Sequence, residues 1–278
     1  MNRYVTKIAD RFTKVFLPRL HTRLRERQLS EFRLQAAVWN NDILRIIEKV
    51  IADSGVYVRG GPFKGMMYWP VGAPGYWAGG LTSSLLGVYE RELHASLAEL
   101  VRQDYEQVIN VGCAEGYYAV GLALRLPAAR VFAFDTDGKA RRLCQAMALV
   151  NGVSDRVVVE GECTVERIRD LTTKRSLIIC DCEGCEVHLL RPDLAPGLAG
   201  CDILVELHDI FQPGITEKLL PRFAPTHEIK LLTTEPRDPA ELQHLEYLSI
   251  EECRKALDER RPGSMQWAVM RSLARAHQ

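Results

Sequence analysis

Acidic side chains and one histidine follow two apolar runs in the second half of the chain. The run SLIIC is followed by Asp181 and Glu183, and the run DILVELHD contains Glu206, His208 and Asp209. Two carboxylates at a strand end can orient a substrate hydroxyl, take its proton or hold a divalent metal, and a histidine can be a general base near neutral pH. The predicted catalytic residues are Asp181, Glu183 and His208, with Asp209 as a further candidate. The alternative is that Asp181 and Glu183 only cap the next helix.

A glycine-flanked loop interrupts a second apolar segment, VINVGCAEGYYAVGLA. Glycine lets the backbone approach a ligand closely because it has no Cβ atom. The spacing G-x-x-x-G differs from the G-x-G-x-x-G of dinucleotide sites and is typical of S-adenosylmethionine (SAM) binding. A glycine pair in a strand-to-helix turn without any ligand is the alternative. The predicted contacts with the cofactor in this loop are Asn110, Gly112, Cys113, Ala114, Glu115 and Gly116, and Asp181 is a further predicted contact.

Two further acids come after the next two predicted strands. Asp135 lies about 20 residues beyond the glycine loop, where a carboxylate can accept hydrogen bonds from both hydroxyls of a ribose. It could instead cap the helix that starts near Gly138, a task that Asp137 could also perform. Glu162 lies where an adenine ring would be held, and this prediction rests on its position alone.

Strands and helices alternate from residue 105 onward, which predicts an α/β fold with a mostly parallel sheet covered by helices on both faces. Ligands of such sheets lie beyond the carboxyl ends of the strands. The seven predicted strands are 107–111, 130–134, 156–160, 176–181, 202–207, 227–233 and 266–271, the last two forming an antiparallel pair. The predicted helices are 117–126, 138–150, 164–170, 184–190, 214–222 and 239–258.

The first hundred residues have a different character. Residues 3–52 are predicted to be mainly helical, and the basic residues within 1–27 could lie on a membrane, contact a partner protein or simply face solvent. A glycine- and aromatic-rich stretch follows, for which we predict a hairpin and a lid-like loop at 68–77. Helical spacing returns at 83–100. The predicted domains are a helical extension, 1–55, and a main domain, 56–278, with its core at 100–271.

Composition narrows the choice of partners and compartment. Lys and Arg together number 36, as do Asp and Glu, so the overall charge does not indicate a nucleic acid partner. The absence of a long uncharged apolar stretch and the irregular spacing of eight cysteines predict a cytoplasmic protein with reduced thiols. Cys180, Cys182 and Cys185 are interpreted as small apolar residues rather than as a metal site.

The segments VINVGCAEGYYAVGLA, FAFDTD, ALVNG, CDCEGCEVHLL and ILVELHD resemble the FkbM-like SAM-dependent methyltransferases. Their Asp-x-Glu-Gly-x-Glu motif is matched by Asp181, Glu183, Gly184 and Glu186. The resemblance covers about residues 85–210 and implies a seven-stranded class I methyltransferase sheet. The family usually has an acid where this chain has Asn110. In metal-assisted O-methyltransferases acidic ligands follow the fourth and fifth strands, which implies that Asp181 and Asp209 could share a magnesium ion.

We therefore expect a SAM-dependent methyltransferase (EC 2.1.1) that methylates a hydroxyl of a small molecule or sugar. His208 would be the base, and Asp181, Glu183 or Asp209 would orient the acceptor or a metal. The alternatives are an N-methyltransferase, or a non-catalytic SAM-fold subunit that binds a partner or membrane through its basic N-terminal helix. The sequence does not indicate the acceptor, the need for a metal or the oligomeric state.

Overall fold

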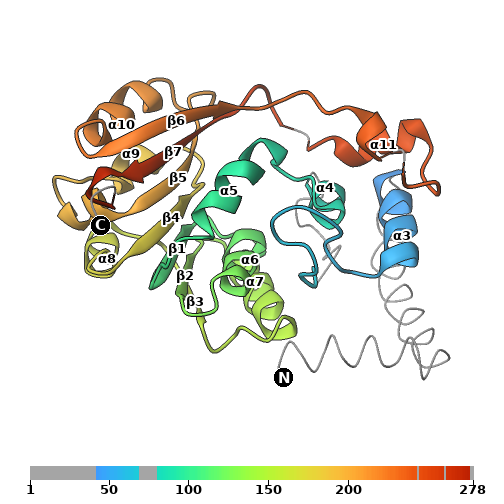
Figure 1. Ribbon diagram of the computed structural model, residues 1–278, viewed down its shortest axis with the longest axis horizontal. Helices are drawn as coiled ribbons and strands as arrows, with labels where there is room; N and C mark the ends of the chain where they lie inside the picture. The colour runs from blue at the N-terminus through green and yellow to red at the C-terminus, as the bar shows by residue number, and fades with distance from the viewer. Residues whose placement is uncertain (1–41, 69–79, 243, 260, 276–278) are drawn as a thin grey trace. The chain divides into compact units, whose positions relative to one another are not determined.

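The computed structural model describes residues 42–68, 80–242, 244–259 and 261–275 (Figure 1). The chain forms two compact units, the first comprising Met1–Tyr89, Val150–Gly152 and Pro236–Arg261, and the second comprising the rest. The predicted basic helix and nearly all of the predicted lid at 68–77 lie outside the described residues. The role of residues 1–27, the division at residue 55 and the cytoplasmic location therefore stay predictions.

The second unit is built on a seven-stranded sheet in the order β3-β2-β1-β4-β5-β7-β6. Its strands are β1 (Gln107–Val111), β2 (Arg130–Phe134), β3 (Val157–Glu160), β4 (Ser176–Cys180), β5 (Asp202–Leu207), β6 (His227–Thr233) and β7 (Gln266–Ser272). Strands β1 to β5 are parallel, and β7 runs antiparallel to both β5 and β6. The predicted fold class is confirmed, and each strand lies within one residue of its predicted bounds.

Helices cover both faces of this sheet, α5, α6 and α7 on one side and α8, α9 and α10 on the other (Figure 1). Every residue of β1, β4 and β5 is buried, as expected for strands packed on both faces. The helical segments are η1 (Arg91–Leu93), α5 (His94–Leu100), α6 (Tyr117–Arg125), α7 (Gly138–Val150), α8 (Val165–Leu171), α9 (Glu186–Leu189), η2 (Pro196–Gly200), α10 (Ile215–Phe223) and η4 (Leu273–Arg275).

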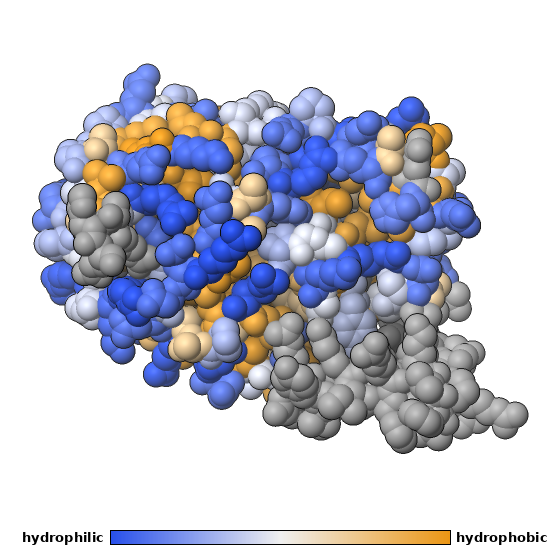
Figure 2. Space-filling model, in the orientation of Figure 1, coloured by the Kyte–Doolittle hydropathy of each residue, from blue (hydrophilic) through white to orange (hydrophobic). Residues whose placement is uncertain are grey.

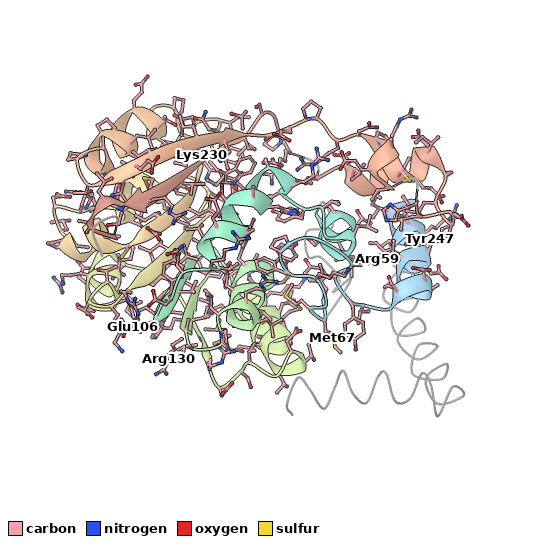
Figure 3. All side chains as sticks on the ribbon, in the orientation of Figure 1. Arg59, Met67, Glu106, Arg130, Lys230 and Tyr247 are labelled. Carbon is pink, nitrogen blue, oxygen red and sulfur yellow. The ribbon has the colours of Figure 1, made fainter. Side chains whose placement is uncertain are left out.

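The described part of the first unit is small and mainly helical. It contains α3 (Asp42–Ser54), α4 (Leu81–Leu86), η3 (Pro239–Leu242) and α11 (Ile250–Leu257). Between α3 and α4 the predicted hairpin is reduced to one antiparallel bridge, between Tyr57 and Met67. The Arg59 guanidinium donates a 2.9 Å hydrogen bond to the Tyr247 hydroxyl, and Figure 3 labels both side chains. Helices α3 and α4 pack against each other, and each buries several apolar side chains, among them Ile47 and Val50 in α3 and Leu85 in α4.

Two helix predictions were wrong. The predicted helix 239–258 is two helices, because the Ser249 hydroxyl and the Glu252 carboxylate form a capping box that starts α11 afresh. The predicted continuous helix at 83–100 is broken, because Gly87 and Glu90 both have left-handed backbone conformations.

None of the described helices is long and apolar enough to cross a bilayer. On the face seen in Figure 2, hydrophobic side chains are interrupted by hydrophilic ones.

Candidate active site

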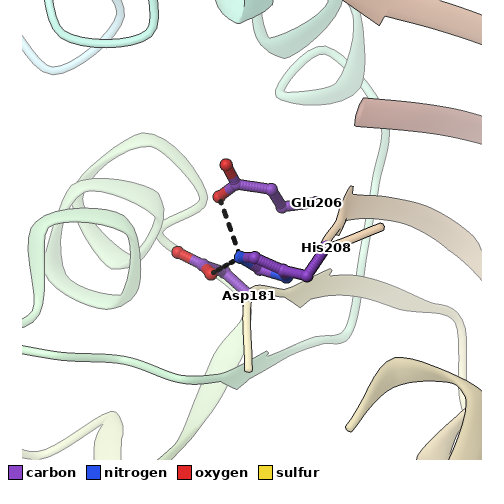
Figure 4. A group of neighbouring side chains, drawn as sticks. All are labelled: Asp181, Glu206 and His208. Atoms are coloured by element: carbon purple, nitrogen blue, oxygen red, sulfur yellow. Dashed lines mark ion pairs between the residues drawn. The ribbon is translucent and has the colours of Figure 1, made fainter. Parts of the chain in front are cut away.

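The carboxyl ends of β4 and β5 bring three ionisable side chains together. The two strands are parallel, with Cys180 beside Val205, so the residues that follow them emerge at the same edge of the sheet. His208 Nε2 lies 3.5 Å from an Asp181 carboxylate oxygen and 3.9 Å from a Glu206 carboxylate oxygen (Figure 4). The predicted catalytic residues Asp181 and His208 are thus neighbours, and Glu206 joins them.

A fourth side chain, Glu186, contacts the other nitrogen of the histidine ring, Nδ1. Its Oε1 atom lies 2.7 Å from His208 Nδ1 and also accepts a hydrogen bond from the backbone N–H of Gly184. Glu186 is 0% exposed and His208 is 2% exposed. The pair fixes the ring so that Nδ1 faces Glu186 and Nε2 faces Asp181 and Glu206. Glu186 belongs to the Asp-x-Glu-Gly-x-Glu motif, which is the sequence signal for it.

The charges around this pair oppose the effect of burial. Burial by itself lowers the pKa of His208, but the hydrogen bond to Glu186 and the negative charges of Asp181, Glu186 and Glu183 raise it above its usual value. Burial raises the pKa of Glu186, but the hydrogen bond with His208, the charge of His208 and the backbone hydrogen bonds of Glu186 and Gly184 together outweigh it, so this pKa is lowered. The two shifts run in opposite directions, as expected for a histidine and a carboxylate that stabilise each other's charged forms.

The other two acids of the predicted group lie differently. Glu183 is on the rim: its side chain is 72% exposed, its backbone is left-handed, and one carboxylate oxygen lies 3.6 Å from His208 Nε2. Asp209 faces elsewhere. Its carboxylate accepts hydrogen bonds from the backbone N–H groups of Gly214 and Thr216, which begin α10. Asp209 therefore caps α10. The expected magnesium ion shared by Asp181 and Asp209 is not supported. Glu206, rather than Asp209, lies beside Asp181 and His208.

The predicted glycine loop runs directly against the end of β4. A Cβ atom on Gly112 would lie 1.5 Å from the carbonyl oxygen of Asp181, and its φ of +76° also favours glycine. Gly116 has a φ of +99°, precedes α6 and packs against Cys144. Ala114, between them, has a left-handed backbone as well. The loop is therefore tightly curled and lies beside the acidic group.

Asp135 links the loop after β2 to the glycine loop. One carboxylate oxygen accepts a hydrogen bond of 2.9 Å from the backbone N–H of Ala114, and the other accepts one of 2.8 Å from that of Asp137. Asp137, in turn, accepts a bond from the backbone N–H of Lys139 in the first turn of α7. The capping role that was left open thus belongs to Asp137. A carboxylate has about four acceptor positions, so Asp135 keeps room for a ligand.

The remaining predicted cofactor residues fall into two groups. Asn110 is 1% exposed, and among the described residues its side-chain oxygen has no hydrogen-bond partner. Cys113 is buried at the start of the loop. Glu115 lies in the same loop, whereas Glu162 is exposed after β3. An orphaned buried oxygen is unusual in a folded protein and indicates a missing donor.

A small pocket opens beside the acidic group. Glu90 and Tyr118 form a hydrogen bond in its wall, and Asp181, Glu206 and Trp267 line it as well. Glu90 is 2% exposed and has a left-handed backbone, which is rare for a residue other than glycine. Trp267 was not among the predicted site residues, because only the pairing of β7 with β5 sets it beside Glu206.

Comparisons with known proteins give the following result. No family model matches the chain, and no curated protein matches it. Similar solved structures include an O-methyltransferase from Bacillus cereus in complex with SAH, with 12% identity and a TM-score of 0.42 over 89% of this chain and 100% of that one. Another is TomG from Streptomyces achromogenes, an O-methyltransferase of tomaymycin synthesis in complex with SAM, with 12% identity and a TM-score of 0.43 over 67% and 81%.

A third is a precorrin-6y C5,15-methyltransferase from Geobacter metallireducens, with 12% identity and a TM-score of 0.40 over 51% of this chain and 76% of that one. All three TM-scores lie below 0.5. These likenesses therefore carry no argument about the function of this chain.

Proposed function

We propose that the protein is a SAM-dependent methyltransferase that methylates a hydroxyl group of a small molecule or sugar, within or near the FkbM-like family. One observation carries this proposal: the backbone of Gly112 lies against that of Asp181. This contact sets the predicted cofactor loop beside the acidic group, at the one edge of the parallel sheet where ligands of such folds bind. A methyl donor and an acceptor hydroxyl could therefore meet there.

The chain offers suitable groups for the donor substrate. The orphaned oxygen of Asn110 could accept a hydrogen bond from the amino group of the methionine part. The free acceptor positions of Asp135 suit the ribose hydroxyls, and the curled loop from Gly112 to Gly116 suits the chain between them. Glu162 would lie on the adenine side.

Methyl transfer to oxygen is an in-line displacement, and it needs an aligned acceptor whose proton can leave. Asp181 is the member of the acidic group that an acceptor reaches most easily, since its side chain is 35% exposed whereas those of Glu206 and His208 are 6% and 2% exposed. His208, held by Glu186, would orient the carboxylates and share the proton. A neutral amine can attack the methyl group without a carboxylate that accepts its proton, whereas a hydroxyl cannot. For this reason we favour O-methylation over N-methylation.

The experiment is calorimetric titration of the protein with SAM. We expect micromolar binding, on the order of −8 kcal/mol, that is at least tenfold weaker in Asp135→Ala. The matched control is Asp137→Ala, a loss of the neighbouring carboxylate that caps α7, which should bind SAM as the wild type does. Absence of binding in a protein shown by circular dichroism to be folded would overturn the proposal and favour a non-catalytic subunit.

A further inference from the structure

The three side chains at the ends of β4 and β5 also have the arrangement of metal ligands. One atom each from Asp181, Glu206 and His208 can be chosen so that all three lie within 4.8 Å of one another. Donors bound to one ion at about 2.1 Å lie roughly 3 to 3.5 Å apart. The separations from His208 Nε2, 3.5 and 3.9 Å, are close to this, and small rotations of the two carboxylates would complete the site.

The second ring nitrogen of His208, Nε2, faces the carboxylate oxygens of the acidic group. Within the described residues, Nε2 of His208 has carboxylate oxygens at 3.5 to 3.9 Å, while Nδ1 makes a hydrogen bond with Glu186. The ring is 2% exposed, and this nitrogen faces the carboxylates of Asp181 and Glu206. A ring nitrogen placed among carboxylate oxygens in this way is suited to a metal ion.

The contact behind the ring has the geometry of a metal-bound histidine. Such a histidine usually gives its other N–H to a carboxylate or carbonyl, which fixes the tautomer and the orientation of the ring. Here the buried carboxylate of Glu186 lies 2.7 Å from Nδ1. Glu186 is itself held by the N–H of Gly184, so this outer contact is built into the start of α9.

The local charge favours a dication as well. Four carboxylates, those of Asp181, Glu183, Glu186 and Glu206, lie within 4 Å of the one imidazole ring. A buried carboxylate needs a close counter-charge to remain ionised, and a bound dication would supply two positive charges to this group.

We propose that Asp181, Glu206 and His208 bind one divalent first-row transition ion, with Glu186 as the outer contact of the histidine. The imidazole ligand favours an ion such as Mn²⁺ over Mg²⁺ or Ca²⁺, which prefer oxygen ligands throughout. An ion at this place would bind an acceptor hydroxyl and ease the loss of its proton. This assignment replaces the pair Asp181 and Asp209 that the sequence suggested.

The test is titration of the metal-free protein with Mn²⁺ in the absence of SAM, followed by electron paramagnetic resonance and by thermal unfolding. We expect one Mn²⁺ per chain, an increase in Tm on binding, and binding at least tenfold tighter than that of Mg²⁺. SAM is absent from this titration, so a failure to bind Mn²⁺ does not affect the methyltransferase proposal. Equally, a failure to bind SAM does not affect the Mn²⁺ result.

Three variants distinguish the proposed ligands Asp181, Glu206 and His208 from the pair Asp181 and Asp209. Asp181→Asn and His208→Gln should weaken Mn²⁺ binding at least tenfold, whereas Asp209→Asn, which changes the acid next to the histidine, should bind as the wild type does. Asp181 is half-buried, so Asp181→Asn should fold. If His208→Gln fails to fold, Mn²⁺ binding by Asp181→Asn still tests the proposal. No stoichiometric binding by the folded wild type, or equal loss in Asp181→Asn and Asp209→Asn, would overturn the proposal.

Discussion

A single backbone position, Gly112, determines whether the glycine loop after β1 can lie against the acidic group after β4. Gly112 leaves β1 with a φ of +76°, and the carbonyl oxygen of Asp181 occupies the space where a side chain would begin. At the opposite extreme, Gly161 has no atom within 4 Å of the position of a Cβ, and it follows β3 on the surface. Glycine is thus required at position 112, where a side chain would collide with the backbone of Asp181, but not at position 161.

We expect Gly112→Ala to destabilise the protein by at least about 2 kcal/mol, because the methyl group forces β1 and β4 apart and the backbone is strained. Gly161→Ala is the matched control and should change the free energy of unfolding by less than about 1 kcal/mol. Urea-induced unfolding measures both. Equal stability of the two variants would show that the contact with Asp181 is not tight.

The acidic group shows what side-chain direction adds to sequence position. Residues 206 and 208 are two apart, so an extended backbone puts both on one side and residue 209 on the other. This rule could have predicted that Glu206, not Asp209, joins His208. The partner of Asp209, Thr216, lies beyond Gly214 in the next helix, and the sequence gives no local signal for that contact.

At the scale of elements, the sequence predicts strands better than their order. Strands β1, β4 and β5 are buried throughout and therefore appear as short apolar runs with clear ends. The insertion of β7 between β5 and β6 has no such signal, because it depends on pairing between residues far apart in the chain. The capping box at Ser249 was present in the sequence as S-x-x-E, and it could have divided the predicted helix 239–258.

The start of α10 provides a test at this scale. Thr216 donates both its backbone N–H and its hydroxyl to Asp209. We expect Thr216→Val to destabilise the protein by about 1 kcal/mol through loss of the hydroxyl bond, with Mn²⁺ and SAM binding unchanged. Thr233→Val, on an exposed position of β6, is the control and should be close to neutral. A loss of Mn²⁺ binding in Thr216→Val would mean that Asp209 serves the site after all.

For the whole molecule, the stability of the fold should depend on pH through a residue remote from the proposed chemistry. His227 opens β6, is 3% exposed, and makes hydrogen bonds of 2.9 Å with Cys201 and Thr226. Burial lowers the pKa of His227 below its usual value. Between that lowered pKa and the ordinary value of about 6.5, the unfolded chain binds the proton and the folded chain does not, so stability falls as the pH falls.

We therefore expect the wild type to lose stability relative to His227→Gln as the pH falls below about 6.5, by up to about 1.4 kcal/mol per pH unit. Urea-induced unfolding at pH 7.5, 6.5 and 5.5 measures the difference between the two proteins. The value at pH 7.5 corrects for the hydrogen bonds that the substitution removes. A difference that does not vary with pH would contradict this assignment of His227.

The place of β7 in the sheet has a consequence for the order of synthesis. A ribosome makes β5 and β6 long before it makes β7, yet β7 is the strand that joins them. Until residue 272 has emerged from the exit tunnel, the nascent chain has an unpaired apolar edge at β5, and Glu206 lacks its neighbour Trp267. The edge of β5 should therefore need shielding until β7 has been made, and the contact between Glu206 and Trp267 can form only then.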